Sequence, residues 1–370
     1  MKQRQVLSIA LVLKALLLGL VFFIGHRYPQ NFNYKNYFGN LYWSQPSFAT
    51  FFQTWDGMHY LFIAQNGYHA GHPTTAFFPL WPFLIRIASP LFAGHFLLTS
   101  LALSNLLSTA SLLILHGWIK KKDEMLADLS TLFILAFPGS FFFILPYSES
   151  LFFFLSVLFF LLLSKKMFFF ASIICFLATI TRPVGIFSVI PLAYTVFKDK
   201  ENRRQWPFIL AGPLGLLTYF LIFKLSTGDP FAGLKIQQNY RSFNSLSKLF
   251  DIIHLFQNYF TVHAFHDVLY SFLDRFWFTL FVITLPFIWN ADKGLFYWAL
   301  CLGLFPVLIN GFTSYLRYLN VIFPFFMALG DAFAKMTPTG RKYSSAITLL
   351  ILFGFQIYFL IQHINNYWVG

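Results

Sequence analysis

The sequence predicts an all-α protein that crosses a membrane several times. Of its 370 residues, 58% are hydrophobic and only 11% are charged, whereas charged residues make up about 25% of an ordinary soluble domain. Long apolar runs recur along the chain, and a bilayer-spanning helix needs ~20 residues of this kind. Short joints that are basic or rich in glycine and proline separate the runs. We therefore expect residues 1–370 to form one integral membrane domain.

The basic residues predict how the chain is threaded. The formal net charge is +13, but the basic clusters stand at every second joint between apolar runs. The clusters are Lys120 to Lys122, Lys165-Lys166, Lys198 to Arg204, and Arg341-Lys342. Loops that stay in the cytoplasm show this excess of Lys and Arg. We therefore expect these joints inside, together with Lys2 and Arg4, and we expect no nucleic-acid partner.

This threading predicts about eleven transmembrane helices. They are expected at residues 6–25, 95–119, 126–145, 150–164, 167–181, 183–197, 206–224, 276–290, 294–309, 315–334 and 344–363. The segment 77–92 contains three prolines, so it is expected to be interfacial or re-entrant. Two long extracytoplasmic loops, at about 26–76 and 225–275, are expected to carry further interfacial helices.

The first of these loops carries the clearest indication of chemistry. Trp55 and Asp56 follow an apolar run, and a carboxylate among aromatic rings at a lipid–water boundary suggests work on a lipid-linked substrate. A helix beginning near Asp56 would place Asp56, His59 and Tyr60 on one face. In a desolvated cleft Asp56 can accept a proton from a substrate hydroxyl. The alternative is that Asp56 caps the helix N-terminus.

Aromatic and histidine side chains surround this carboxylate. Trp55 and Tyr60 are candidates to stack on a sugar ring, although aromatic residues also anchor proteins at membrane interfaces. His59, His69 and His72 lack an i, i+4 histidine pair and a carboxylate cluster, so we expect neither a metal nor another cofactor.

Two arginines stand at the outer ends of predicted spans. A guanidinium at Arg182 or Arg317 can hold a lipid phosphate through two hydrogen bonds. The alternatives are snorkelling, or a salt bridge to Glu149 or Asp229. Glu149 itself is either a hydrogen-bonding group of a pocket or the partner of one arginine. The threading places all these charges and Asp56 on the extracytoplasmic side of the membrane, where we expect Asp56 and the two guanidiniums to converge on one crevice.

Six sequence runs resemble one known family. They are WDGMHYLFIAQNGY, AFFPLWPFLIR, PYSESLFFFLS, ATITRPVG, TGDPFAGLKIQQNY and SYLRYLNVIFPFF, in this order between about residues 54 and 327. The chain resembles the PIG-V-like mannosyltransferases, whose eukaryotic members add the second mannose of the glycosylphosphatidylinositol anchor and which have bacterial relatives. The resemblance implies the GT-C glycosyltransferase fold and a polyprenyl-phosphate sugar donor, without a nucleotide.

The resemblance also implies roles for individual residues. An acidic residue of the first extracytoplasmic loop is the catalytic base in the GT-C superfamily, and Asp56 stands at that position. Substrate binding is implied for Trp55, His59, Tyr60, Glu149 of the Tyr-Ser-Glu motif, Arg182 of Thr-Arg-Pro, Asp229, Gln237 and Tyr240 of Gly-Asp-Pro…Gln…aromatic, and Arg317 before the last Phe-Pro. His59 stands where many relatives carry an aromatic residue, and Tyr240 where many carry Trp.

The expected function is therefore an inverting, metal-independent transferase in a bacterial cell membrane. It would move a sugar, most often mannose, from polyprenyl phosphate to an extracytoplasmic glycan or lipid acceptor, so membrane lipids are expected partners. A lipid or glycan transporter without transferase activity is the alternative, and it would need charged residues at mid-membrane. A structural membrane subunit is a third interpretation.

Overall fold

The structure is a computed structural model that describes residues 1–24, 27, 48–238 and 251–369. The regular elements within these ranges are helices, as predicted, and only an isolated bridge joins Ala264 to Ser271. In chain order they are α1 (Gln3–Ile24), α2 (Phe48–Phe52), α3 (Asp56–Asn66), η3 (Pro73–Ala76), α4 (Leu80–Ala88), η4 (Ser89–Phe92), α5 (Phe96–Lys120), α6 (Glu124–Ala136), η5 (Pro138–Ile144), α7 (Glu149–Ser164), α8 (Phe168–Thr179), η6 (Pro183–Ser188), α9 (Val189–Lys198), η7 (Lys200–Leu210), α10 (Ala211–Thr227), α11 (Ala232–Gln237), α12 (Ile252–Phe260), α13 (Phe272–Ala291), α14 (Lys293–Asn310), α15 (Tyr315–Leu319), α16 (Phe323–Ala334) and α17 (Pro338–Ile364).

The lengths and composition of the helices are those of an integral membrane protein. Five helices within the described ranges are long and apolar enough to cross a bilayer: α1, α5, the continuous η7–α10 pair, α13 and α17. The bent pair α6–η5 would make a sixth span, and several further apolar helices are shorter. The predicted count of eleven is therefore not confirmed. The segment 77–92 forms the short helices α4 and η4, which agrees with the expectation that it is not a straight span.

Two predicted spans are interrupted. Residues 126–145 do not form one helix, because α6 ends and the chain bends by 78° into η5. Pro138 opens η5, and a proline disfavours helical conformation in the residue before it. Residues 315–334 are likewise divided into α15 and α16, with Pro324 at the start of α16, where its missing N–H costs no helical hydrogen bond.

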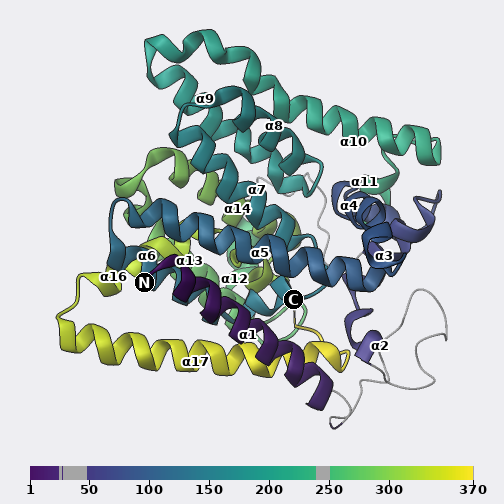
Figure 1. Ribbon diagram of the computed structural model, residues 1–370. Helices are drawn as coiled ribbons and strands as arrows, with labels where there is room; N and C mark the ends of the chain where they lie inside the picture. Colours follow the sequence, from purple (N-terminus) through teal and green to yellow (C-terminus); the bar gives the residue numbers. More distant parts are fainter. Residues whose placement is uncertain (25–26, 28–47, 239–250, 370) are drawn as a thin grey trace.

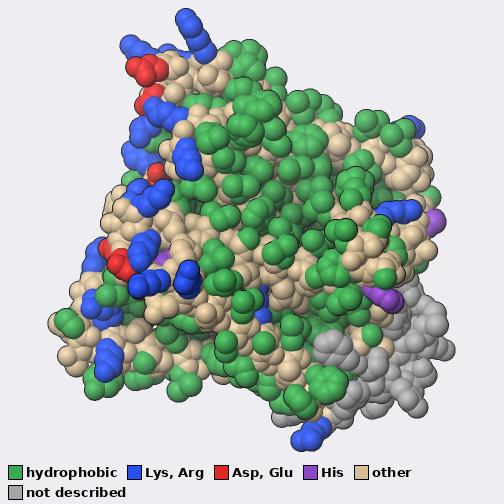
Figure 2. Space-filling view, viewed as in Figure 1, with side chains coloured by type: hydrophobic (Ala, Val, Ile, Leu, Met, Phe, Trp, Pro, Cys, Tyr) green, Lys and Arg blue, Asp and Glu red, His purple; other side chains and the backbone are tan. Residues whose placement is uncertain are grey.

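The termini of the long helices define two ends of the bundle. Helices α1, α5 and α17 run alongside one another, while α3, α4 and α11 gather at the end farthest from the N-terminus (Figure 1). Figure 2 shows charged side chains gathered along the edge where α1 begins, beside a largely apolar face. At this edge the Met1 ammonium pairs with Asp128 at 2.5 Å, and Lys120 donates to the Met1 carbonyl at 2.8 Å. The N-terminus and the Lys120 joint, which the threading places on the cytoplasmic side, therefore lie together.

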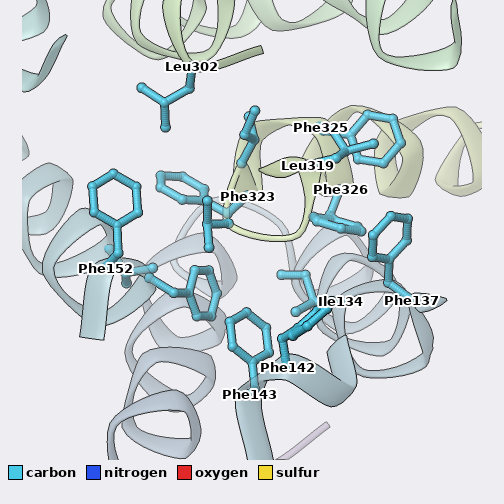
Figure 3. Close-up of a cluster of buried hydrophobic side chains, with 14 of the residues drawn as sticks. Ile134, Phe137, Phe142, Phe143, Phe152, Leu302, Leu319, Phe323, Phe325 and Phe326 are labelled. Carbon is cyan, nitrogen blue, oxygen red and sulfur yellow. The ribbon is translucent and has the colours of Figure 1, made fainter. Parts of the chain in front are cut away.

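A core of aromatic side chains lies beneath the elements that will form the candidate site. Phe137, which joins α6 to η5, and Phe142 and Phe143 of η5 pack with Phe152 of α7 and Phe323 of α16 (Figure 3). These rings are at most 3% exposed. The interrupted segment η5 is thus packed into a buried aromatic cluster.

One charged side chain is buried halfway along a span. Lys14 of α1 is 6% exposed, and its ammonium donates to the Asn105 carbonyl, Ser108 Oγ and Thr109 Oγ1 of α5 at 2.5 to 3.0 Å. Three acceptors satisfy all three ammonium donors. The lysine therefore joins two spans with its charge fully engaged.

Candidate functional site

Four charged side chains from distant parts of the chain meet in one cluster. Nη1 of Arg317 pairs with Oδ2 of Asp56 at 2.6 Å, and Nε of Arg317 donates to Oε1 of Glu149. Nη1 of Arg182 forms an ion pair with the same Glu149 oxygen at 2.8 Å. The structure therefore joins the two arginines and two of the three acidic residues singled out in the sequence. We call these four residues the charge cluster.

The exposed fraction of the side chains rises from Glu149 at the centre of the charge cluster to Asp56 at its open side. The side chain of Glu149 is 0% exposed, and those of Arg182 and Arg317 are each 10% exposed. Asp56 is 31% exposed. Two carboxylates balance two guanidiniums, so the buried charges are compensated, as buried charges must be. Asp56 is the member that a ligand reaches most easily.

Aromatic rings flank both guanidiniums. The Arg317 Cζ lies 4.7 Å from the ring centroid of Tyr147 and 5.3 Å from that of Phe142. The Arg182 Cζ lies 5.6 Å from the ring centroid of Tyr318. Cation–π contacts at these distances stabilise a guanidinium without using its N–H groups. The rings therefore orient the arginines and leave hydrogen-bond donors for other partners.

The backbone around Asp56 explains how its carboxylate reaches the cluster. Helix α3 begins at Asp56, as the sequence analysis assumed. Trp55 is its N-cap residue with φ 50° and ψ −131°, a rare conformation for a side-chain-bearing residue. The Asp56 carboxylate pairs with Arg317 and is not the cap. A Cβ at Gly57 would lie 2.8 Å from the Phe52 carbonyl and 2.9 Å from Pro146 Cγ. Only glycine allows α3 to approach the segment that leads into α7.

His59 and Tyr60 hold α3 in place behind Asp56. Tyr60 is 5% exposed, and its hydroxyl lies 2.9 Å from Ser148 Oγ, directly before Glu149. Burial, and then the nearby Glu149 charge, raises the pKa of Tyr60. His59 is 3% exposed and stacks on Phe77 with 4.7 Å between ring centroids. Burial lowers the pKa of His59 to about 4, against the opposing effect of Asp56, so its imidazole is neutral.

The two arginines sit at interruptions of apolar helices. Arg182 lies between α8 and η6, and Pro183 keeps it extended at φ −151° and ψ 150°. Arg317 lies in the short helix α15, which follows Ser314 in the left-handed region at φ 61°. A Cβ at Gly139 of η5 would lie 2.8 Å from the Leu316 carbonyl, so the η5 backbone packs closely against the α15 backbone. Each interruption turns a guanidinium toward Glu149.

A buried carboxylate that the sequence analysis did not single out supports Arg317. Asp274 of α13 is 0% exposed, and its Oδ1 accepts the Leu316 N–H at 3.0 Å. Ser271 caps α13 by accepting the Asp274 N–H at 3.1 Å, and His266 Nδ1 lies 3.6 Å from Asp274 Oδ2. The pattern Ser-x-x-Asp before an apolar run is a helix-capping signature and could have identified this position.

The remaining predicted residues lie outside the charge cluster. Asp229 pairs with Lys235 at 2.6 Å near the surface, and this hydrogen bond lowers the pKa of the Asp229 carboxyl. Gln237 donates to the Ala76 carbonyl at 3.0 Å and so joins α11 to η3. Neither residue contacts a member of the cluster within the described ranges. Tyr240 lies outside the residues that the structure describes.

Histidines near α3 engage aromatic rings. His72 stacks on Phe62 with 4.7 Å between ring centroids, and its Nδ1 lies 2.8 Å from Thr74 Oγ1. Among the described residues, no three His, Cys, Asp or Glu side chains are grouped so that they could hold a metal ion.

Comparison with known proteins indicates a family and a fold. The family model described as mannosyltransferase (PIG-V) matches residues 33–202, and no curated protein matches the chain. The Archaeoglobus fulgidus oligosaccharyltransferase solved with zinc and sulfate is similar at TM-score 0.53 and 15% identity, over 99% of this chain and 53% of that one. The oligosaccharyltransferase AglB of the same organism, solved with an inhibitory peptide and a dolichol-phosphate, is similar at TM-score 0.54 and 14% identity, over 100% and 56%.

The chain therefore spans about half the length of these solved structures. At such low identity the likeness establishes a shared fold. The matched residues 33–202 contain three of the four members of the charge cluster, and Arg317 joins them from outside the matched range.

Proposed function

We propose, from the match of residues 33–202 to the PIG-V mannosyltransferase family model and from the GT-C-like sequence resemblance, that this chain moves a sugar from a lipid phosphate to an acceptor hydroxyl. The sugar is most often mannose in the family, the donor is a polyprenyl phosphate, and the acceptor is a glycan or lipid. One observation carries the proposal: a part-exposed carboxylate, Asp56, is joined through Arg317 and Glu149 to a second guanidinium, Arg182. A base and a phosphate-binding cation are the two groups that this transfer needs.

The proposed reaction is a single displacement with inversion. The acceptor oxygen bonds to the anomeric carbon while Asp56 takes its proton. The bond from the anomeric carbon to the phosphate oxygen breaks, and its electron pair leaves with the lipid phosphate. A phosphate dianion is stable at neutral pH, so no second acid is required, in contrast to glycoside hydrolysis. Guanidinium groups stabilise the charge that develops on the leaving oxygen.

The guanidiniums are preorganised for this role. Arg317 uses Nε on Glu149 and Nη1 on Asp56, while its Nη2 donates to none of the described residues. Arg182 engages Glu149 through Nη1 alone. Both arginines therefore retain N–H donors for phosphate oxygens, and Glu149 holds them side by side before the substrate arrives. Arg-phosphate pairs are commonly bidentate, which favours this arrangement over a single lysine.

The distribution of charge supports an extracytoplasmic site. Charged side chains gather at the end of the bundle where α1 begins, and α3 and α4 lie at the other end (Figures 1 and 2). If the basic end faces the cytoplasm, Asp56 faces outward, where a lipid-linked sugar would reach it from the bilayer. The AglB structure named above contains a dolichol-phosphate, which supports a lipid phosphate as donor. The bacterial cell membrane is proposed as the location from the sequence resemblance alone.

The transport alternative lacks a comparable observation. A transporter needs charged side chains at mid-membrane that are free to bind the transported molecule. Lys14 is a buried charge in that region, but the three acceptors from α5 already occupy its ammonium.

The decisive test is Asp56→Asn, which keeps the shape of the side chain and removes the base. We expect release of polyprenyl phosphate from labelled polyprenyl-phosphate mannose to fall by about 10² to 10⁴, the contribution of a general base, while donor binding stays within about threefold. Membranes from the producing cells supply the acceptor. Asp199→Asn, at an exposed ion pair with Lys166, is the control and should keep full activity.

Near wild-type release by the Asn variant would refute the base assignment. If the wild-type protein released no lipid phosphate but moved the labelled lipid across vesicle membranes, the transporter alternative would replace the transferase.

A further inference from the structure

The C-terminal segment, residues 365–369, folds back onto the molecule after α17 ends at Ile364. Asn365 and Asn366 are 1% and 9% exposed, and Val369 is 1% exposed. Asn366 has φ 67°, a left-handed conformation that asparagine tolerates better than most residues and that reverses the chain. The segment is thus a packed part of the structure.

This segment is fixed to the Arg317 side of the site. The Val369 carbonyl lies 3.0 Å from His266 Nε2, and His266 Nδ1 lies 3.6 Å from the buried Asp274 carboxylate. Asp274 in turn accepts the N–H of Leu316, the neighbour of Arg317. A continuous series of polar contacts therefore joins the C-terminal segment to the helix that carries Arg317.

The same segment contacts the Asp56 side of the site. The ring of Trp368 meets that of Trp55 edge to face, with 5.3 Å between centroids and 82° between planes. Trp55 is the residue directly before Asp56. Both residues are half-buried, so each keeps part of its surface accessible.

Trp368 also carries an unused hydrogen-bond donor. Its Nε1 is buried and donates to no acceptor in the described part of the chain. Buried indole N–H groups usually find a partner. A sugar supplies both complements of an indole: hydroxyl oxygens that accept its N–H, and a C–H face that packs on its ring.

We infer that Trp368 is a substrate-contacting residue that binds a sugar unit beside Asp56. The sugar belongs either to the lipid-phosphate donor or to a glycan acceptor, since both must reach the same carboxylate. The inference rests on the proposed function for the identity of the site. It assigns to the C-terminal segment a part in substrate selection.

The test compares two lipids that differ only in the sugar. Binding of short-chain polyprenyl-phosphate mannose and of short-chain polyprenyl phosphate is measured on the full-length protein in detergent, and the KM for the membrane acceptor is measured in the release assay. For Trp368→Ala we expect either the mannose lipid to bind about tenfold more weakly or the acceptor KM to rise about tenfold. Binding of the bare lipid phosphate should stay within about twofold.

Two further variants sharpen the test. Trp368→Phe keeps a ring and loses the N–H, so its effect should be intermediate. Tyr367→Ala, at an adjacent exposed residue, is the matched control and should bind both lipids as the wild type does. The weakened step identifies the sugar as that of the donor or that of the acceptor, and either result supports the inference.

Three results would overturn it. Unchanged lipid binding and acceptor KM in Trp368→Ala would exclude a sugar contact. Equal weakening of both lipids with a lower melting temperature would reduce Trp368 to a packing role. If the wild-type protein bound neither lipid, the proposed function itself would fail. This outcome is seen in the wild type alone, so it is distinguishable from a failure of the Trp368 inference.

Discussion

Replacing Glu149 by Gln is expected to destabilise the protein strongly, because Glu149 is the buried centre of the charge cluster. Its carboxylate is fully buried and compensates two guanidiniums. In the Gln variant Arg317 keeps Asp56, but Arg182 loses the only ion pair it makes within the described residues. Removing one partner of a buried pair costs about 3–5 kcal/mol. Because Arg317 keeps a partner, we expect the lower value, about 3 kcal/mol, or roughly a hundredfold in the folding equilibrium.

The assay is equilibrium unfolding in detergent micelles, followed by circular dichroism, on single and double variants. If Arg182 and Glu149 interact, the double variant Glu149→Gln with Arg182→Gln should recover part of the loss, with a coupling free energy of about 1–3 kcal/mol. Asp229→Asn breaks an exposed pair of similar length and should change stability little. A Glu149→Gln protein as stable as the wild type, or strictly additive losses in the double variant, would refute the reasoning.

Two further predictions concern the residues that support the charge cluster. Asp274→Leu removes the acceptor of the Leu316 N–H and should slow turnover by up to about a hundredfold, because Arg317 is then misplaced. Asp274→Asn keeps an oxygen acceptor and should restore most of the rate. Equal initial rates for the two variants would contradict a positioning role. Burial holds the pKa of His59 at about 4, below its ordinary 6.5, so the folded state binds fewer protons than the unfolded state. The free energy of unfolding should therefore be full above pH 6.5 and fall toward pH 4 by at most about 3 kcal/mol. Denaturation at several pH values should show this slope in the wild type and lose it in His59→Phe, and the same slope in both proteins would exclude His59 as its source.

The sequence correctly predicted helices that consist of one continuous apolar run. Helices α1, α5, α13 and α17 overlap predicted spans, because the hydrophobic pattern alone determines a helix that lies in lipid. A helix start near Asp56 was a premise of the sequence analysis, and α3 does begin there. Hydrophobic periodicity did not show the divided helices, since the apolar pattern continues through Pro138 and Pro324. How η5 and α15 then pack depends on a contact between distant segments, that of Gly139 with the Leu316 carbonyl.

The sequence predicted that Asp56 and the two arginines converge on one extracytoplasmic crevice, but not which charges pair. The alternation of basic joints is a one-dimensional rule, so it assigns Asp56, Glu149, Arg182 and Arg317 to a side without pairing them. The alternative pairing with Asp229 was equally consistent with that rule, and in the structure Asp229 pairs with Lys235. The observed pairs depend on how closely α3 and α15 approach α7, which packing decides. Their catalytic and binding roles remain predictions.

The interruptions of the apolar helices and the position of the charge cluster have a common cause. Non-helical backbone at membrane depth is tolerated only where protein or a cavity surrounds it, since lipid offers no hydrogen-bond partners. The break before η6 carries Arg182, and the break that creates α15 carries Arg317. A chain that must place guanidiniums inside a bundle does so most easily at such breaks, where the backbone already turns inward. Each of these two breaks thus carries one arginine of the charge cluster, much as broken spans carry the binding sites of transporters.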